Sequence, residues 1–281
     1  MPDFDFSRYL DAKRTVDDRS LSPRLIETLK HSLGPKAHIL ELGAGTGAGS
    51  HRLWGQGVAP QGTWCLMDQD SGLLEIALAR LTGNFQKSGG RIDAHQGVLG
   101  INAPPSGSWD LIFAQAVLDL FPLGEILDWI LKLGHSHTLF YFSLNFDALT
   151  HWEPELDRDL DDRIALAYHR SMDERFIGGK RSGDSRCGRH LFTALPTAGF
   201  EIVDACASDW AIWPKNGAYH NQEEYFLNCM LHFHETSIAT RQEVSPQELS
   251  WWLSQRREHV HRGKAVLLVH QWDFIAKHSP R

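Results

Sequence analysis

Cysteine is scarce in this chain of 281 residues, and the sequence lacks the features of disulfide-rich, zinc-binding and membrane-spanning proteins. Its four cysteines are widely spaced and form no C-x-x-C pair, which favours reduced thiols over a disulfide framework or a zinc knuckle. No apolar run approaches the ~20 residues that cross a bilayer. Residues 1–6 lack the basic start and apolar stretch of a secretory signal. We therefore expect a cytoplasmic protein that makes no membrane contact.

Basic residues are also outnumbered: 28 Lys and Arg stand against 35 Asp and Glu, and the formal net charge is -7. Because no long run of Lys and Arg occurs, we expect no broad phosphate-binding surface and no nucleic-acid partner. A local basic groove around Lys180, Arg181 and residues 186–189 stays open as an alternative.

The composition, 42% hydrophobic and 22% charged, is typical of a soluble globular protein. The length is near the upper limit for a single hydrophobic core, which favours one domain with a cap over two independent domains. We expect residues 1–281 to form a single domain, with an N-terminal segment and helix at 1–34 and a substrate-covering insertion at 147–189. The oligomeric state is left open.

Strands and helices alternate along the chain, which predicts a parallel sheet with crossover helices. After residue 145 the pattern changes to a long polar segment, in which only residues 159–172 are periodic enough for a helix. The predicted strands are 38–42, 63–68, 91–96, 109–114, 139–145, 200–207 and 265–275. The other predicted helices are 22–33, 47–53, 71–81, 124–133, 191–197, 222–240 and 246–261.

A glycine-rich turn follows the first predicted strand, with Gly43, Gly45 and Gly47 at alternate positions. Glycine has no side chain and tolerates positive φ, so backbone N–H groups in such a turn can approach a ligand closely. The spacing of Gly43, Gly45 and Ala48 also fits a dinucleotide site. Asp68, at the end of the second strand, can accept hydrogen bonds from the ribose hydroxyls of either cofactor. These residues alone indicate a nucleotide-like cofactor and do not choose between the two.

The pattern E-x-G-x-G-x-G at residues 41–47 resembles motif I of the class I (Rossmann-like) S-adenosylmethionine (SAM)-dependent methyltransferases. Residues 66–74, 108–114 and 199–203 are similar to further strand patterns of that family. The resemblance implies an α/β fold with a seven-stranded, mostly parallel sheet, an antiparallel last strand and helices on both faces. It also implies an enzyme that uses SAM as its cofactor. An NAD(P)-dependent oxidoreductase is the alternative that the glycines leave open.

The resemblance also implies which residues contact the cofactor. Many family members bind the adenine amine with an acidic residue after the third strand, whereas Val98 stands at that position here. Arg19, or else Arg14, is the candidate partner for the methionine carboxylate of SAM. The expected cofactor contacts are Arg19, Glu41, Gly43, Ala44, Gly45, Thr46, Gly47, Asp68, Gln69, Gly97, Val98 and Gln115.

Substrate and catalytic candidates come from the loops after the fourth and fifth strands and from the polar segment, since ligands of open α/β sheets bind beyond the carboxyl ends of the strands. The substrate candidates are Asp119, Asn145, His151, Trp152 and Arg175. Methyl transfer mainly needs positioning and sometimes a base to deprotonate the acceptor. His169 is the leading candidate for that base, with Tyr168 and Asp173 beside it.

A metal site is not expected. His232 and His234, like His259 and His261, stand two residues apart in predicted helices, where side chains point about 200° apart. The chain also lacks the Asn/Asp-Pro-Pro-Tyr and Pro-Cys signatures of methyltransferases that act on nucleic-acid bases. We therefore expect methyl transfer to an oxygen, nitrogen or carbon atom of a small molecule. An RNA or protein methyltransferase and a SAM-binding protein without activity stay open.

Overall fold

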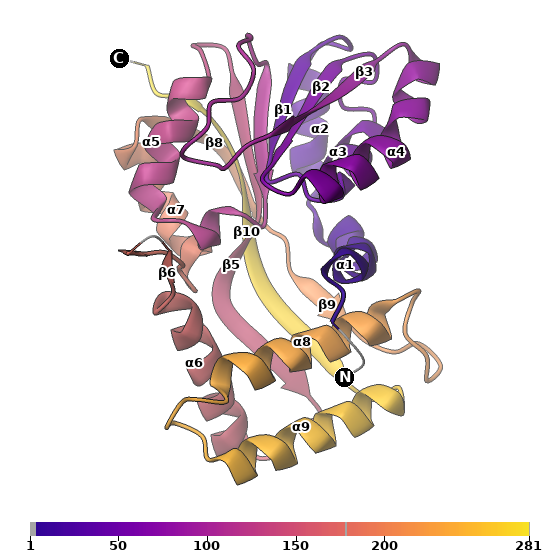
Figure 1. Cartoon of the computed structure of the whole chain (residues 1–281), viewed down its shortest axis with the longest axis vertical. Coiled ribbons are helices and arrows are strands. Elements are labelled where there is room, and N and C mark those ends of the chain that lie inside the picture. The colour runs from indigo at the N-terminus through magenta and orange to yellow at the C-terminus, as the bar shows by residue number, and fades with distance from the viewer. Residues whose placement is uncertain (1–3, 178, 281) are drawn as a thin grey trace.

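A computed structural model describes residues 4–177 and 179–280, so the first three residues of the expected N-terminal segment lie outside the described part. An eight-stranded sheet forms its centre, with the strand order β3-β2-β1-β4-β5-β10-β8 and with β9 paired to β10 (Figure 1). The strands β1 to β5 run parallel, whereas β10 is antiparallel to β5, β8 and β9. The strands are β1 His38–Leu42, β2 Thr63–Asp68, β3 Arg91–Gln96, β4 Leu111–Gln115, β5 Leu139–Glu153, β8 Phe200–Ala207, β9 Trp210–Ile212 and β10 Val266–His278.

Helices cover both faces of this sheet. On one face, α2 (Pro23–Ser32), α3 (Ala48–Gly55) and α4 (Ser71–Ser88) bury their apolar stripes against β1, β2 and β4. On the other face, α5 (Leu123–Leu133) and α7 (Cys187–Thr197) pack against the same strands. This arrangement confirms the expected α/β fold with a mostly parallel sheet and an antiparallel last strand, β10, which lies between β5 and β8. The sheet has eight strands rather than the seven expected, because β9 also pairs with β10.

The helix starts follow from local sequence. Ser22 caps α2 by accepting the N–H of Leu25, and Pro23 occupies the first helical turn. Asp70 caps α4 by accepting the N–H groups of Gly72 and Leu73. The cap at Ser22 fixes the start of the helix that leads into β1, and the cap at Asp70 fixes the loop at the carboxyl end of β2.

The outer halves of β5 and β10, with β9 paired to β10, extend beyond the rest of the sheet as an arm, visible below the sheet in Figure 1. Leu144 and Ala148 have positive φ, and the pairing register shifts nearby. Asp273 of β10 stabilises the positive-φ backbone at Leu144, because its Oδ1 accepts the N–H of Leu144 at 2.7 Å and the hydroxyl of Ser208 at 2.6 Å. The arm therefore bends away from the sheet at defined residues.

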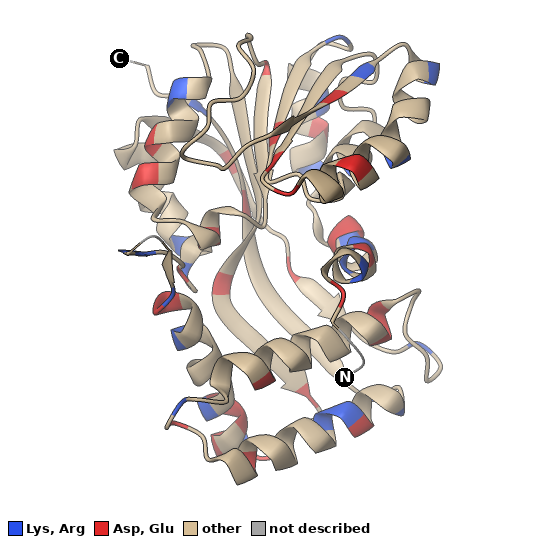
Figure 2. Ribbon diagram, viewed as in Figure 1, with Lys and Arg blue, Asp and Glu red and all other residues tan. Residues whose placement is uncertain are grey.

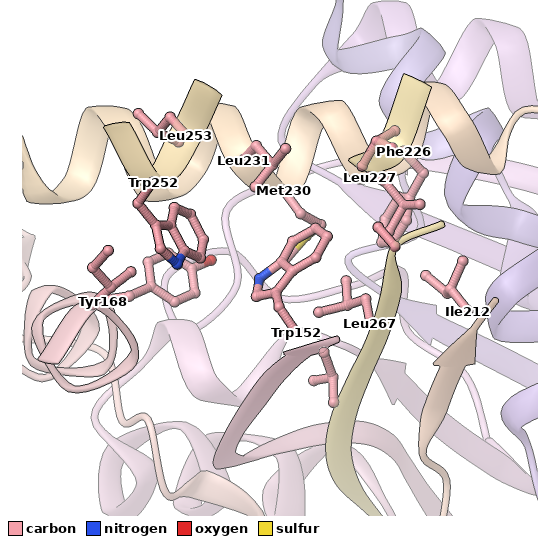
Figure 3. Close-up of a cluster of buried hydrophobic side chains, with 14 of the residues drawn as sticks. Trp152, Tyr168, Ile212, Phe226, Leu227, Met230, Leu231, Trp252, Leu253 and Leu267 are labelled. Atoms are coloured by element: carbon pink, nitrogen blue, oxygen red, sulfur yellow. The ribbon is translucent and has the colours of Figure 1, made fainter. Parts of the chain in front are cut away.

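A second layer of structure, which we call the cap, packs on this arm. It consists of α1 (Phe6–Ser20), α6 (Arg158–Asp173), α8 (Glu223–Ile238), α9 (Pro246–His261) and β9. Its side chains form a separate apolar cluster that includes Trp152, Tyr168, Phe226 and Trp252 (Figure 3). Within the described residues, no helix is long and apolar enough to cross a membrane.

The main differences from the sequence-based expectation lie in and around the cap. Residues 147–153, expected to begin a polar insertion, continue β5, because Thr150 and Trp152 face the apolar core of the cap. The charged N-terminal segment forms α1, and a short hairpin, β6 (Phe176–Ile177) and β7 (Lys180–Arg181), follows α6. Neither the hairpin nor β9 was expected, since each is too short to show a periodic pattern.

Candidate functional site

The glycine turn after β1 requires its glycines. Gly43, Gly45 and Gly47 have φ of 70°, 52° and 72°, in the left-handed region that side chains disfavour. A Cβ on Gly43 would lie 2.6 Å from Cγ2 of Val117, and one on Gly47 would lie 2.9 Å from Cβ of Ala77. The backbone therefore turns sharply at the carboxyl edge of the sheet and leads into α3, whose first turn has no side-chain cap.

Glu41, on β1, connects the strand before this turn to the helix after it. Its side chain is buried, and Oε2 accepts the N–H of Ser50 at 3.2 Å and the hydroxyl of the same residue at 2.5 Å. Burial raises the pKa of Glu41 to about 7, although the bonds from Ser50 oppose the rise. Glu41 thus fixes the start of α3 against β1.

Asp68 stands beside the turn at the end of β2. Its Oδ2 accepts the N–H of Gly45 at 2.8 Å, and its Oδ1 accepts the N–H of Asp70 at 3.0 Å. The N–H of Ala44 is committed to the carbonyl of Met67 at 3.0 Å. A carboxylate offers about four acceptor positions. Two of those of Asp68 therefore stay open for the hydroxyls of a ribose.

The segment after β3 presents an apolar side chain next to Asp68. The side chain of Val98 is 38% exposed, and its N–H donates to Oδ1 of Asn102 at 2.8 Å. Gln96 donates from Nε2 to the carbonyl of Gln69 at 3.0 Å, which ties the loop after β2 to the end of β3. With no acidic side chain at Val98, a flat ring here would make apolar contacts together with Gly97.

The helix α1 lies across the glycine turn, a contact that the sequence did not indicate. Arg80 of α4 donates to the carbonyl of Thr46 at 3.1 Å and to Oδ1 of Asp11 at 2.7 Å. Leu10 lies over Gly45, where an added Cβ would be 3.4 Å from its Cδ1. The first half of α1 therefore covers the turn, and Arg80 holds the helix and the turn together.

A second arginine joins α1 to the end of β4. The buried Arg52 donates from Nε to Asp18 at 2.5 Å and from Nη1 to Oε1 of Gln115 at 2.8 Å. Gln115 is thereby held under the turn. Nη2 of Arg14, also on α1, lies 3.4 Å from Nδ1 of His51 on α3, so the Arg14 side chain points toward the helix that follows the glycine turn.

Arg19 lies elsewhere. Its guanidinium pairs with the buried carboxylate of Glu223 on α8 and donates to the carbonyl of Ala211 on β9 at 2.9 Å. Arg19 thus connects α1 to α8 and β9 within the cap. Of the two arginines expected to serve the methionine carboxylate, the placement favours Arg14.

His169 lies on α6 within the cap. Its Nε2 is 3.2 Å from Oγ1 of Thr150, and its ring meets Phe146 edge-on with 5.3 Å between ring centroids. Burial lowers the pKa of His169 to about 4. The imidazole is therefore neutral at pH 7, and it is a weak base.

The other two catalytic candidates face different neighbours. Tyr168 stacks on His234 of α8 with 4.1 Å between ring centroids, and burial raises the pKa of its hydroxyl. Asp173 accepts the N–H of Ser185 at 2.7 Å through Oδ1 and so caps the segment before α7. The rings of Tyr168 and His169 have centroids 6.2 Å apart, but no hydrogen bond joins the side chains of Tyr168, His169 and Asp173 among the described residues.

Three of the substrate candidates are committed to the arm and the cap. The buried Asn145 donates from Nδ2 to the carbonyl of Trp272 at 2.8 Å. His151 points outward and pairs with Glu153 at 3.0 Å. Trp152 is buried in the cap core (Figure 3). A cavity of about 30 Å³ beside it has room for about one or two water molecules, so it is too small for a substrate.

Asp119 and Arg175 are the two substrate candidates that the structure brings near each other. The carbonyl of Asp119 accepts the N–H of Asp184 at 3.1 Å, and the carbonyl of Arg175 accepts the N–H of Ser182 at 2.8 Å. Oδ1 of Asp119 is buried and finds no hydrogen-bond partner among the described residues. Burial raises the pKa of Asp119, and the positive charge of Arg175 opposes the rise.

Backbone strain marks the same place. Ala116, directly after β4, has φ of 54°, a conformation that is rare for a residue with a side chain. Its N–H donates to the carbonyl of Ser143 at 2.9 Å, so the strained residue is locked to β5. Strain of this kind concentrates at functional sites. Val117 then packs on Gly43, so Asp119 lies two residues beyond a residue that contacts the glycine turn.

The fold matches solved structures over nearly the whole chain. A methyltransferase from Bacillus halodurans C-125 is 13% identical and superposes with a TM-score of 0.57 over 92% of this chain and 98% of its own. A SAM-dependent methyltransferase from Methanosarcina mazei is 15% identical, with a TM-score of 0.52 over 93% and 99%. The protein YcgJ from Bacillus subtilis is 10% identical, with a TM-score of 0.51 over 92% and 97%.

The chain has the Rossmann-like fold of class I methyltransferases, with the cap added at the carboxyl edge of the sheet. No protein-family model matches the sequence, and no curated protein does.

Proposed function

We propose that this protein is a SAM-dependent methyltransferase that acts on a small molecule held between the carboxyl edge of the sheet and the cap. The observation that carries the proposal is the turn with three left-handed glycines, set beside Asp68 in a sheet whose antiparallel β10 lies between β5 and β8. A dinucleotide site explains the glycines and Asp68, but it does not require this strand order. The strand order therefore favours SAM.

The residues present fit that cofactor. The turn from Gly43 to Gly47 would hold the methionine part, with Arg14 near its carboxylate, and Asp68 would bind the ribose hydroxyls. Val98 and Gly97 would flank the adenine. When bound, SAM supplies a methyl group made electrophilic by the sulfonium. The chain itself supplies positioning, and the cap excludes water from the acceptor.

Asp119 is the best-placed residue to take a proton from the acceptor. It follows the strained end of β4 beside the glycine turn, and its Oδ1 is free of other hydrogen bonds among the described residues. Burial raises its pKa, which strengthens the carboxylate as a base. His169 is less suitable, since its pKa is lowered to about 4 and its Nε2 lies against Thr150.

A small acceptor and a cytoplasmic location are parts of the same proposal. Lys and Arg are interspersed with Asp and Glu along the ribbon (Figure 2), and the net charge is -7. Neither feature favours a phosphate-rich partner. The four cysteines are free thiols, and three of them are buried, which suits a reducing compartment.

Titration calorimetry with SAM, S-adenosylhomocysteine and NADH tests the cofactor. We expect S-adenosylhomocysteine to bind, NADH not to bind, and Asp68→Asn to weaken the binding of S-adenosylhomocysteine about tenfold or more, since a bond to a charged acceptor is replaced by a neutral one. Asp93→Asn, on the exposed outer strand β3, is the matched control and should leave the affinity unchanged. Binding of NADH without binding of S-adenosylhomocysteine would overturn the proposal.

A further inference from the structure

Arg175 differs from the other partly buried arginines in the described part of the chain. Eight arginines in the described part of the chain are buried or partly buried: Arg14, Arg52, Arg80, Arg163, Arg175, Arg241, Arg256 and Arg257. Seven of them contact a carboxylate, an amide, a carbonyl or an imidazole through the guanidinium. For the side chain of Arg175, no hydrogen bond and no ion pair is found among the described residues. None of its guanidinium nitrogens is among the fully buried atoms without a partner in the described residues, so the guanidinium is open to solvent and to a ligand.

The backbone holds Arg175 at the edge of the proposed acceptor site. Arg175 follows the end of α6, and its carbonyl accepts the N–H of Ser182, which closes the β6–β7 hairpin. One residue further, a Cβ on Gly183 would lie 3.4 Å from Cβ of Arg175. The next residue, Asp184, donates its N–H to the carbonyl of Asp119. Arg175 and Asp119 therefore lie on two sides of the same short segment.

Most of the other charges near this segment are paired; the exposed Arg186 is an exception, with no side-chain partner among the described residues. Asp184 pairs with His190 at 2.7 Å, and Lys13 of α1 pairs with Asp17 at 2.7 Å. In the hairpin, Lys180 pairs with Glu125 at 2.7 Å. Burial raises the pKa of both Asp119 and Tyr168, and the positive charge of Arg175 opposes the rise in each, so the guanidinium is within electrostatic range of both residues.

A guanidinium with this freedom matches one kind of ligand group. It is a planar fork of N–H donors that pairs with a carboxylate through two parallel hydrogen bonds, and it stays charged at every physiological pH. Asp119 repels a second anion at its own position. A ligand anion is therefore favoured at the Arg175 end of the site and disfavoured at the Asp119 end, which leaves the Asp119 end for an uncharged or protonated nucleophile.

We infer that the methyl acceptor is a carboxylic acid whose carboxylate is bound by Arg175. This inference rests on the proposed function, because the bound acid is a methyl acceptor only if the protein is a methyltransferase. Binding of the acid does not depend on the methyl-transfer step. It goes beyond the proposed function in naming the substrate class, and it assigns Arg175 the role of a specificity-determining residue.

The test compares matched acids and carboxamides by thermal shift and titration calorimetry. The panel pairs hydroxybenzoates, hydroxyphenylacetates and hydroxy and amino fatty acids of increasing length with the corresponding amides, each with and without S-adenosylhomocysteine. We expect members of the acid set to bind the wild-type protein and their amides to bind about 10- to 100-fold more weakly. Arg175→Gln should remove this preference, and Arg175→Lys should restore part of it.

Lys180→Gln is the matched control, because it removes the same charge from an exposed residue of the same hairpin. It should keep the preference for acids. A purely structural role of Arg175 toward Asp119 predicts lower stability in Arg175→Gln with an unchanged ratio of acid to amide affinity, and that result overturns the inference. Acids that bind no better than amides, or a panel in which no acid binds in an Arg175-dependent way, also overturn it. Failure of the wild-type protein to bind S-adenosylhomocysteine rejects the proposed function separately, since the acid and amide affinities are also measured without it.

Discussion

Replacing Asp273 with Asn is expected to remove a pH dependence of stability that a single buried carboxylate produces. Asp273 of β10 is fully buried, and its Oδ1 accepts hydrogen bonds from Leu144 and Ser208 where the arm leaves the sheet. Its Oδ2 accepts the hydroxyl of Tyr141 at 3.2 Å. Asn keeps the oxygen that Leu144 and Ser208 use, and its amide N–H can donate to the oxygen of Tyr141. The substitution therefore changes the charge more than the packing.

Burial raises the pKa of Asp273 from 3.8 to about 7, although three hydrogen bonds oppose the rise. The folded protein consequently keeps a proton that the unfolded chain releases at lower pH. Stability then falls as the pH rises from about 4 to about 7 and is constant above that. At about 1.36 kcal/mol per pKa unit the whole effect is about 4 kcal/mol, of which about 2–3 kcal/mol falls between pH 5 and pH 8.

Urea unfolding followed by tryptophan fluorescence at pH 5 and pH 8 measures this effect. Relative to the wild type, Asp273→Asn should gain about 2–3 kcal/mol in free energy of unfolding between the two pH values. The same comparison for Asp93→Asn, an exposed carboxylate on β3, should show no such gain, and contributions from Glu41 cancel in the difference. An equal stability difference at pH 5 and pH 8 for Asp273→Asn would refute the reasoning.

Three further predictions concern the proposed site. Gly47→Ala should destabilise the protein by about 1–2 kcal/mol or more, measured by urea unfolding, because φ is 72° and the new Cβ would meet Ala77 at 2.9 Å. Arg19→Ala should lower stability by about 1–3 kcal/mol, since it leaves the buried Glu223 without its ion pair, while calorimetry finds the affinity for S-adenosylhomocysteine unchanged. A weaker affinity would return Arg19 to the cofactor site. Asp119→Asn should keep that affinity and lower kcat with an accepted acid about 100-fold or more; an unchanged kcat would exclude Asp119 as the base.

The sheet was largely predictable because its strands are short apolar runs bounded by strong turn signals. The predicted bounds of β1, β2, β3 and β8 agree with the structure. The end of β5 was not predictable in the same way. The outer half of β5 alternates buried and exposed residues only because the cap covers one of its faces. No sequence feature near β5 predicts that the cap packs there.

The helix α1 was missed for a related reason. Its charges suggest a solvated segment, yet Asp11 and Asp18 pair with Arg80 and Arg52 on helices that lie far along the sequence. The turn residues of the cofactor site could be found because they are consecutive. Arg80 and Arg52, which attach α1 to that turn, carry no local signal.

The acceptor site shows the same limit. Asp119 and Arg175 were predicted as separate candidates, each from its own loop. The segment 182–184 contacts both residues and follows both in the sequence, so neither loop alone predicts that they lie near each other. His169 was favoured for its chemistry, but its position against Thr150 depends on how α6 packs on the arm. Residue type therefore gives candidates for the site, but the arrangement of these candidates depends on the fold.

The cap is assembled from three separate stretches of the chain: α1, the region from the outer half of β5 through α6, and the region from β9 through β10. During synthesis, the last strand to emerge is β10, which must enter between β5 and β8, and long-range pairings of this kind form slowly. Until then β5 keeps an unpaired edge, β8 and β9 have no strand partner among the described residues, and the apolar faces of α6, α8 and α9 lack part of their support. A nascent or truncated chain that ends before residue 266 should therefore be retained by chaperones or aggregate, and the cap cannot be exchanged as a single cassette.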